Sequence, residues 1–252
     1  MRGWGGSCHG MLDAATVLGV YALSSLIWLA TVDWAGGLLL CKLVKLGQEA
    51  AFQATAAVLA ALGAQRAFLL RPSSSLACGK RRLRIMLALA WAYALFNSLP
   101  NLYWWTEVRL MDGERVFSQC INSFHLYPYS QKLLALFNAT SIWHLVSVFW
   151  LPLAIMLVTY SYIVAKIWLY YHPSPHLVTL LLLSVFGVSW LPYHLSAVLA
   201  YTHPELFHGY SDYLQLLGLL VLLPAVINPY IYGLSTGSKP HTHIPLKPLR
   251  VP

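Results

Sequence analysis

The chain has 252 residues, of which 58% are hydrophobic and only 10% are charged, and its mean hydropathy is +0.62. This composition excludes an ordinary soluble domain and predicts an integral protein of the lipid bilayer. The formal charge of +8 would suit nucleic acid, but the 16 Lys and Arg residues lie between hydrophobic stretches, where they act as topology signals. We therefore expect no nucleic-acid partner.

Hydrophobic stretches long enough to cross a bilayer recur along the chain. A spanning helix needs about 20 mostly apolar residues. Six segments meet this need, and polar or turn-rich sequence separates them: 12–32, 40–70, 84–105, 140–170, 177–201 and 213–234. We predict an all-α integral membrane protein with a helical bundle over residues 1–235. The Pro- and His-rich tail over 236–252 is expected to be cytoplasmic and disordered.

Loop charges predict the orientation of these spans. The loop after the second span contains five basic residues and no acidic one, so it should be cytoplasmic: Arg71, Lys80, Arg81, Arg82 and Arg84. The next loop, 107–132, is more acidic and contains Cys120, so it should lie outside, and alternation places Cys41 outside as well. Both cysteines then lie in the compartment where a disulfide can persist, while Cys78 should stay a reduced thiol.

The second, third and fourth spans carry polar, aromatic or proline residues whose spacings can be compared with known families. Arg66 follows Cys41 by 25 positions, and Lys45 and Gln48 lie three residues apart on one helical face. Trp91 and Pro100 occur in the third span, and Tyr160 follows Pro152 by eight positions in the fourth.

The last two spans each contain a proline within a fixed polar and aromatic setting. One reads Phe186-Gly-Val-Ser-Trp190-Leu-Pro192-Tyr193-His194, and the other reads Asn228-Pro229-Tyr230-Ile231-Tyr232. Proline inside a helix removes a backbone hydrogen bond and kinks the axis, which is tolerated in lipid only where neighbouring groups satisfy the freed carbonyl. Two successive kinks favour a bundle that can change shape.

Together these residues resemble the rhodopsin-like (class A) G-protein-coupled receptors, whose sixth and seventh helices carry Phe-x-x-x-Trp-x-Pro and Asn-Pro-x-x-Tyr. The resemblance implies a truncated seven-helix bundle with about six transmembrane helices, placed as a multi-pass protein in the plasma membrane. It also implies a disulfide between Cys41 and Cys120 and a heterotrimeric G protein as partner.

The resemblance further implies an activation switch in which Arg66 meets Tyr160 and Tyr232 when the sixth family helix swings outward. The residues assigned to this switch are Arg66, Tyr160, Phe186, Trp190, Pro192, Asn228, Pro229 and Tyr232. The alternative is that Trp190 and Phe186 are ordinary interior aromatic residues and the prolines are simple kinks.

The sequence from Cys41 to Gln48 resembles the peptide-receptor group that includes vasopressin, oxytocin, gonadotropin-releasing hormone, corazonin and adipokinetic hormone receptors. The segment 116–120, Val-Phe-Ser-Gln-Cys, supports this likeness. The implied ligand is a small, amidated peptide hormone, and the implied binding residues are Lys45, Gln48, Asn101, Trp190, Tyr193 and His194. Alternatively, Lys45 could extend outward toward the membrane surface, and His194 could be an interior histidine.

The chain also departs from the family pattern. We expect no counterpart of the first family helix, and Gln65 and Ala67 stand beside Arg66 where Asp and Tyr are usual. The loop between the fourth and fifth spans is very short. These departures support a second hypothesis, a non-signalling receptor-derived membrane protein that acts by forming a dimer with a full-length relative.

A transporter or membrane enzyme is the third class considered. It would need acids or a catalytic cluster within the spans, and Asp13 and Glu49 are the intramembrane acids that we identify. No nucleophile, base and orienting group converge in the sequence. We therefore predict no enzymatic activity, no cofactor and no metal site, and we regard Asp13 as a candidate for sodium or proton binding.

Overall fold

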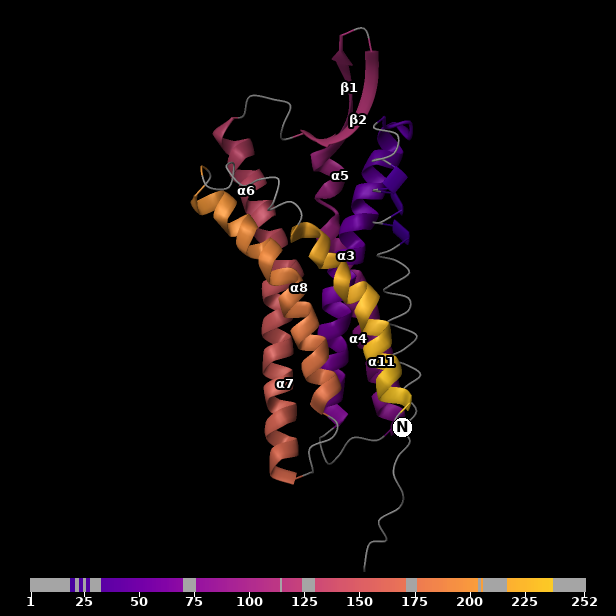
Figure 1. Ribbon diagram of the computed structural model, residues 1–252, viewed down its shortest axis with the longest axis vertical. Helices are drawn as coiled ribbons and strands as arrows, with labels where there is room; N and C mark the ends of the chain where they lie inside the picture. The colour runs from indigo at the N-terminus through magenta and orange to yellow at the C-terminus, as the bar shows by residue number, and fades with distance from the viewer. Residues whose placement is uncertain are drawn as a thin grey trace, which may run out of the picture.

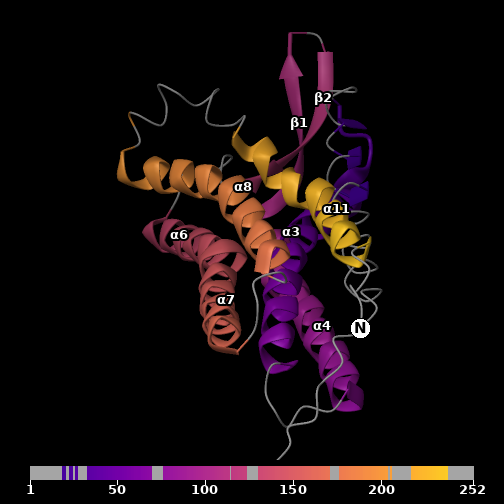
Figure 2. The same cartoon turned by 60° about the horizontal axis from the view of Figure 1, so that its bottom comes forward.

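The computed structural model describes residues 19–20, 23–24, 26–27, 33–69, 76–113, 115–123, 130–170, 176–203, 205 and 217–237. Most of the first predicted span lies outside these residues, as do Asp13 and the tail from residue 238 onward. Within the described residues, long helices run roughly along one axis, and a β-hairpin projects beyond them at one end (Figures 1 and 2).

Helix α3 spans Gly37–Leu69 and is 33 residues long, which corresponds to about 50 Å. Its start is held by Trp34, whose indole Nε1 donates a hydrogen bond to the Gly37 carbonyl oxygen at 2.9 Å. Gly37 has a φ of +72°, a left-handed conformation that glycine adopts without steric cost. The helix predicted over 40–70 is therefore present and begins three residues earlier.

The third predicted span, 84–105, overlaps the helical segment Gly79–Trp104, which is long and apolar enough to cross a membrane and begins earlier than expected. Helix α4 spans Leu76–Ser98, so the basic segment before the span already forms its first turns. A turn at Leu99 and Pro100 follows, and the short helix α5 spans Asn101–Trp104. The interruption has a local cause, because Pro100 has no N–H to donate to the carbonyl four residues earlier.

The polar segment after α5 forms a β-hairpin, an element that the sequence did not indicate, in a chain whose other described elements are helical. Strand β1 spans Trp105–Asp112 and β2 spans Arg115–Asn122, and they pair antiparallel with Glu107 opposite Cys120. Gly113 makes the turn with a φ of +61°. The backbone N–H of Trp34 donates to the Ser118 carbonyl oxygen at 2.8 Å, which ties β2 to the residues before α3.

The fourth predicted span, 140–170, begins earlier than expected and contains an irregular turn. Helix α6 spans Gln131–Leu145, the π-helical turn η3 spans Val146–Trp150, and α7 spans Leu151–Tyr170. Ser130 caps the start, since its Oγ accepts a hydrogen bond from the Leu133 N–H at 3.3 Å. Pro152 follows η3, and a wider turn there relieves the clash between its ring and the preceding carbonyl.

The last two spans are helical and contain the predicted interior prolines. Helix α8 spans His176–Thr202 with Pro192 inside it, and it changes direction along its length (Figures 1 and 2). The 3-10 turn η4 spans Gly218–Leu222 and leads into α11, Leu223–Gly237, which contains Pro229. Among the described residues, three helical segments are long and apolar enough to cross a membrane, namely Gly79–Trp104, Gln131–Lys166 and Leu180–Ala200. The number of six spans stays a prediction.

The main core lies between α3, η3, α7, α8 and α11, and its largest members are aromatic. Phe149, Phe186 and Trp190 are almost completely buried there, together with Met156 and Tyr160. On α3, the alanines 50, 51, 54, 56 and 60 are buried. Such small side chains let helix backbones approach closely, as interfaces between membrane helices require. Large apolar residues face outward instead, as expected for lipid contact: Leu39, Phe96, Val158 and Val188.

Candidate functional site

A cavity of about 270 Å³ opens where α3, α5, β1, α6, η3, α8 and η4 meet. Five of the six predicted ligand-binding residues line it: Lys45, Gln48, Asn101, Trp190 and Tyr193. The helical face predicted from the spacing of Lys45 and Gln48 therefore points into the bundle. The alternative of a Lys45 side chain directed outward does not describe this structure.

Neighbouring groups hold the polar side chains of this cavity in place. The ammonium Nζ of Lys45 lies over the Trp105 ring, 4.2 Å from its centroid, in a cation–π contact. The Trp105 indole Nε1 donates to the Asn101 Oδ1 at 3.0 Å, and the Gln48 Nε2 donates to the Ser24 Oγ at 2.7 Å. The cavity thus presents a cation and two amides whose orientations are fixed by contacts.

His194 does not share this position. Its side chain is fully buried, and its ring stacks on Phe149 with centroids 4.4 Å apart. Neither ring nitrogen has a hydrogen-bond partner among the described residues. The structure therefore places His194 in the aromatic core and does not bring it to the cavity wall.

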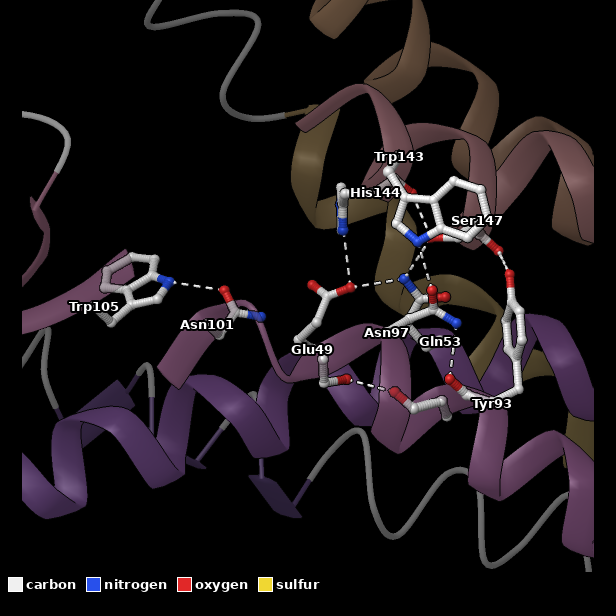
Figure 3. A network of polar contacts seen from close by, with 11 residues as sticks. Glu49, Gln53, Tyr93, Asn97, Asn101, Trp105, Trp143, His144 and Ser147 are labelled. Carbon is white, nitrogen blue, oxygen red and sulfur yellow. Dashed lines mark hydrogen bonds and ion pairs between the residues drawn. The ribbon is translucent and has the colours of Figure 1, made fainter. Parts of the chain in front are cut away.

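Sequence reasoning missed a polar network at the inner side of the cavity (Figure 3). The Glu49 Oε1 lies 2.8 Å from the His144 Nδ1 and accepts a hydrogen bond from the Gln53 Nε2 at 2.9 Å. Gln53 Nε2 also donates to the Ser147 Oγ at 3.0 Å. This network joins α3 to α6 and η3. The available signal was an acid within a span, Glu49, whose partner could not be identified without the fold.

The same network extends to α4. The Tyr93 hydroxyl donates to the Ser147 carbonyl oxygen at 2.8 Å, and the Trp143 Nε1 donates to the Asn97 Oδ1 at 2.7 Å. Figure 3 shows these side chains close together, with Tyr93 and Asn97 from α4, Trp143 from α6 and Ser147 from η3. A second cavity, of about 360 Å³, lies beside them and is lined mainly by residues of α4, α5, α6 and the hairpin.

A disulfide closes the outer end of the site. Cys41 at the start of α3 is bonded to Cys120 on β2, with their Cα atoms 5.6 Å apart. The predicted pairing is confirmed. Because β2 pairs with β1, the bond holds the whole hairpin above the cavity.

The comparison with known families agrees with this architecture. Residues 11–232 match the family described as 7 transmembrane receptor (rhodopsin family). The chain belongs to this family. The receptor is similar to the G-protein coupled receptor daf-38 of Caenorhabditis elegans, with 32% identity over 167 residues that cover 63% of this chain and 40% of that protein.

Gonadotropin-releasing hormone receptors are also similar to this receptor. The protein of that name from Octopus vulgaris is 29% identical over 145 residues, which cover 58% of this chain and 34% of the relative. The one from Homo sapiens is 24% identical over 230 residues, which cover 82% of this chain and 69% of the relative. The receptor chain thus spans less than half of the first two relatives that it matches.

The aromatic residues predicted to form the switch lie directly below the cavity. Trp190 stacks on Phe186 with centroids 5.6 Å apart, and Phe186 stacks on Phe149 at 5.6 Å. Phe52 of α3 meets Trp190 edge to face at 5.8 Å. Since Trp190 also contributes to the cavity wall, this stack connects the cavity with the core of the receptor.

At the opposite end of α3, Tyr160 of α7 packs against Gly63, which lies three residues before Arg66. Tyr160 is buried, and a Cβ on Gly63 would lie only 2.9 Å from its ring. Arg66 lies in the last turn of α3. Its neighbour Gln65 donates from Nε2 to the Gly79 carbonyl oxygen at 2.9 Å, so the residue in the family's Asp position ties α3 to α4.

The remaining switch residues lie in α11. Asn228 is buried, and neither polar atom of its amide has a partner among the described residues. Pro229 follows it within the helix. Tyr232 belongs to α11, but its side chain lies outside what the structure describes. The structure therefore brings Trp190, Phe186 and Tyr160 into one core, and the switching roles stay predictions.

Proposed function

We propose that this chain acts in the plasma membrane as a receptor for a small, amidated peptide hormone. The observation that carries this proposal is the convergence of Lys45, Gln48 and Asn101 on one cavity beneath a disulfide-held hairpin. A peptide offers carbonyl acceptors and amide donors. An ammonium group supplies three donors, and each side-chain amide supplies both donors and an acceptor.

The relatives add support of a second kind. Several of them carry the name gonadotropin-releasing hormone receptor, which favours a hormone as ligand. The cavity wall includes Tyr193 beside these polar residues, so that both a polar backbone and an apolar side chain of a peptide find matching surface.

Signalling would pass from the cavity through Trp190. Its ring touches both the cavity and Phe186, and it belongs to α8, which contains Pro192. A ligand that binds better to one arrangement of this stack shifts the receptor toward that arrangement. The proposed response is a movement of α8 near Tyr160 and Arg66, where a heterotrimeric G protein would bind.

Binding of labelled amidated peptides to membranes carrying the receptor tests the ligand assignment. Lys45→Ala should weaken binding of the selected peptide at least about tenfold, because hydrogen bonds from charged groups contribute about 1.5–3 kcal/mol. Lys42→Ala is the matched control, since Lys42 lies three residues earlier in α3 and does not line the cavity. Equal binding by wild type and Lys45→Ala would contradict the assignment.

A second candidate function is a non-signalling receptor that modulates a full-length relative. The contact of Gln65 with Gly79 favours it, because Gln65 supplies no carboxylate to restrain and release Arg66. Calcium or cyclic-nucleotide responses of transfected cells to the peptide distinguish the two. Silence despite surface expression and peptide binding would support the modulator.

A further inference from the structure

Glu49 and His144 lie at the boundary between two cavities. Both residues line the cavity of about 270 Å³ that contains Lys45, and both also line the cavity of about 360 Å³. Their side chains are 14% and 34% exposed respectively, although His144 belongs to a helical segment apolar enough to cross a membrane. The pair can therefore be reached from the cavities.

Glu49 and Lys45 lie one helical turn apart on α3 but do not pair with each other. Lys45 is held by the Trp105 ring, and Glu49 is held by His144 and Gln53. Residues four apart on a helix are separated by about 6 Å along its axis. The two cavities thus present the Glu49 carboxylate and the Lys45 ammonium group at a fixed spacing, and each can bind a different group of one ligand.

The Glu49 carboxylate has room for a further partner. Its two contacts both involve Oε1, and Oε2 accepts no hydrogen bond from the described residues. A carboxylate inside a bundle is costly unless its oxygens are fully paired, and a single imidazole nitrogen serves one oxygen. A planar guanidinium can serve both oxygens at once with parallel hydrogen bonds.

The second cavity supplies aromatic surface for such a group. Trp104, Phe137 and Trp143 line it, and Trp104 and Phe137 meet edge to face with centroids 5.2 Å apart. Guanidinium groups favour contact with aromatic faces. In the part of the chain that the structure describes, Glu49 is the acidic residue that lines these two cavities.

We propose that the second cavity is a subsite for a guanidinium side chain of the ligand. The guanidinium group binds the Glu49 carboxylate and replaces His144 as its partner. Lys45 meanwhile binds a carbonyl oxygen of the same ligand. This inference rests on the proposed peptide-receptor function and makes it more specific: the hormone carries an arginine side chain.

The test uses a probe pair that does not depend on knowing the hormone. N-acetyl-arginine amide and its neutral counterpart N-acetyl-citrulline amide have nearly the same shape and differ in charge. Ser141→Cys introduces a thiol into the wall of the second cavity. Its reaction with a membrane-impermeant thiol reagent on intact cells is followed with each probe, and the chain with Ser141 unchanged gives the background.

The arginine probe should slow this reaction at a concentration at least about tenfold lower than the citrulline probe, as expected for a charge-assisted contact. Adding Glu49→Gln should remove that difference. Glu205→Gln is the control, since Glu205 is exposed and does not line the cavities. The inference would be overturned if the two probes protected equally, or if their protecting concentrations still differed in Glu49→Gln. The contact between Glu49 and His144 would then serve only to join α3 to α6.

Two combinations of results separate this inference from the proposed function. If a peptide loses affinity in Lys45→Ala but its arginine and citrulline forms bind equally, the receptor function stands and the subsite fails. If the arginine probe protects through Glu49 while no amidated peptide binds, the subsite stands and the peptide assignment fails.

Discussion

The wall of the cavity and the core beneath it are held together by different kinds of contact. Around the cavity, a disulfide, a cation–π contact and hydrogen bonds join residues from distant parts of the chain. In the core, stacked aromatic rings and alanines make the contacts, and the polar atoms of Trp190, His194 and Asn228 lack partners among the described residues. Directional bonds fix one arrangement, whereas sliding helices can exchange apolar contacts. The cavity wall is therefore the rigid part of the receptor, and the aromatic core beneath it is the part that can change its packing.

Removing the disulfide should have the largest effect on this comparison. Cys120→Ser frees the hairpin from α3 and should lower stability by about 2–5 kcal/mol. The thermal unfolding of the solubilised receptor and its amount at the cell surface measure the loss. Cys78→Ser serves as control, because Cys41 pairs with Cys120. An unchanged unfolding temperature for Cys120→Ser would mean that the hairpin is held by its other contacts alone.

Gly63→Ala tests the core. The added methyl group would lie 2.9 Å from the Tyr160 ring, and such overpacking costs about 1–3 kcal/mol. Gly187→Ala in α8 is the matched control, since a Cβ there meets nothing within 4 Å and should stabilise by about 0.5–1 kcal/mol. Opposite shifts of the thermal unfolding temperature are expected. Equal shifts would show that the core near Tyr160 yields more easily than its packing indicates.

Trp143→Phe should have the smallest effect. It removes the hydrogen bond to Asn97 and keeps an aromatic ring, so the expected loss is about 1 kcal/mol. Trp150→Phe is the control, because Trp150 is similarly exposed and makes a ring contact with Phe149. Thermal unfolding of both variants measures the difference. Equal unfolding temperatures for the two variants would mean that the network around the cavity is less rigid than its hydrogen bonds indicate.

Local sequence signals predicted the helices well where one pattern dominated. The spacing of Lys45 and Gln48 predicted the face of α3 that lines the cavity, and the interior prolines of α8 and α11 lie where expected. The break at Pro100 was missed because the apolar run continues through it to Trp105, so hydrophobicity outweighed the missing N–H.

Contacts between distant segments could not be predicted in the same way. The hairpin lies in a polar, turn-rich segment, which predicts a loop, and its attachments to Cys41 and Trp34 are distant in sequence. Glu49 was recognised as an intramembrane acid, but the identity of its partner His144 depends on how α6 is rotated against α3. The sequence pattern within α3 or within α6 does not determine how one helix is rotated relative to the other.

The π-helical turn between α6 and α7 determines this rotation. Such a turn holds one residue more than an α-helical turn, and one residue corresponds to about 100° around a helix axis. Deleting a single residue within Val146–Trp150 would therefore rotate α6 and turn His144 away from Glu49, while α7 kept its position. The contact between His144 and Glu49 thus depends on the rotation of α6 relative to α7. An insertion or deletion of one residue between these two helices changes that rotation in a single step.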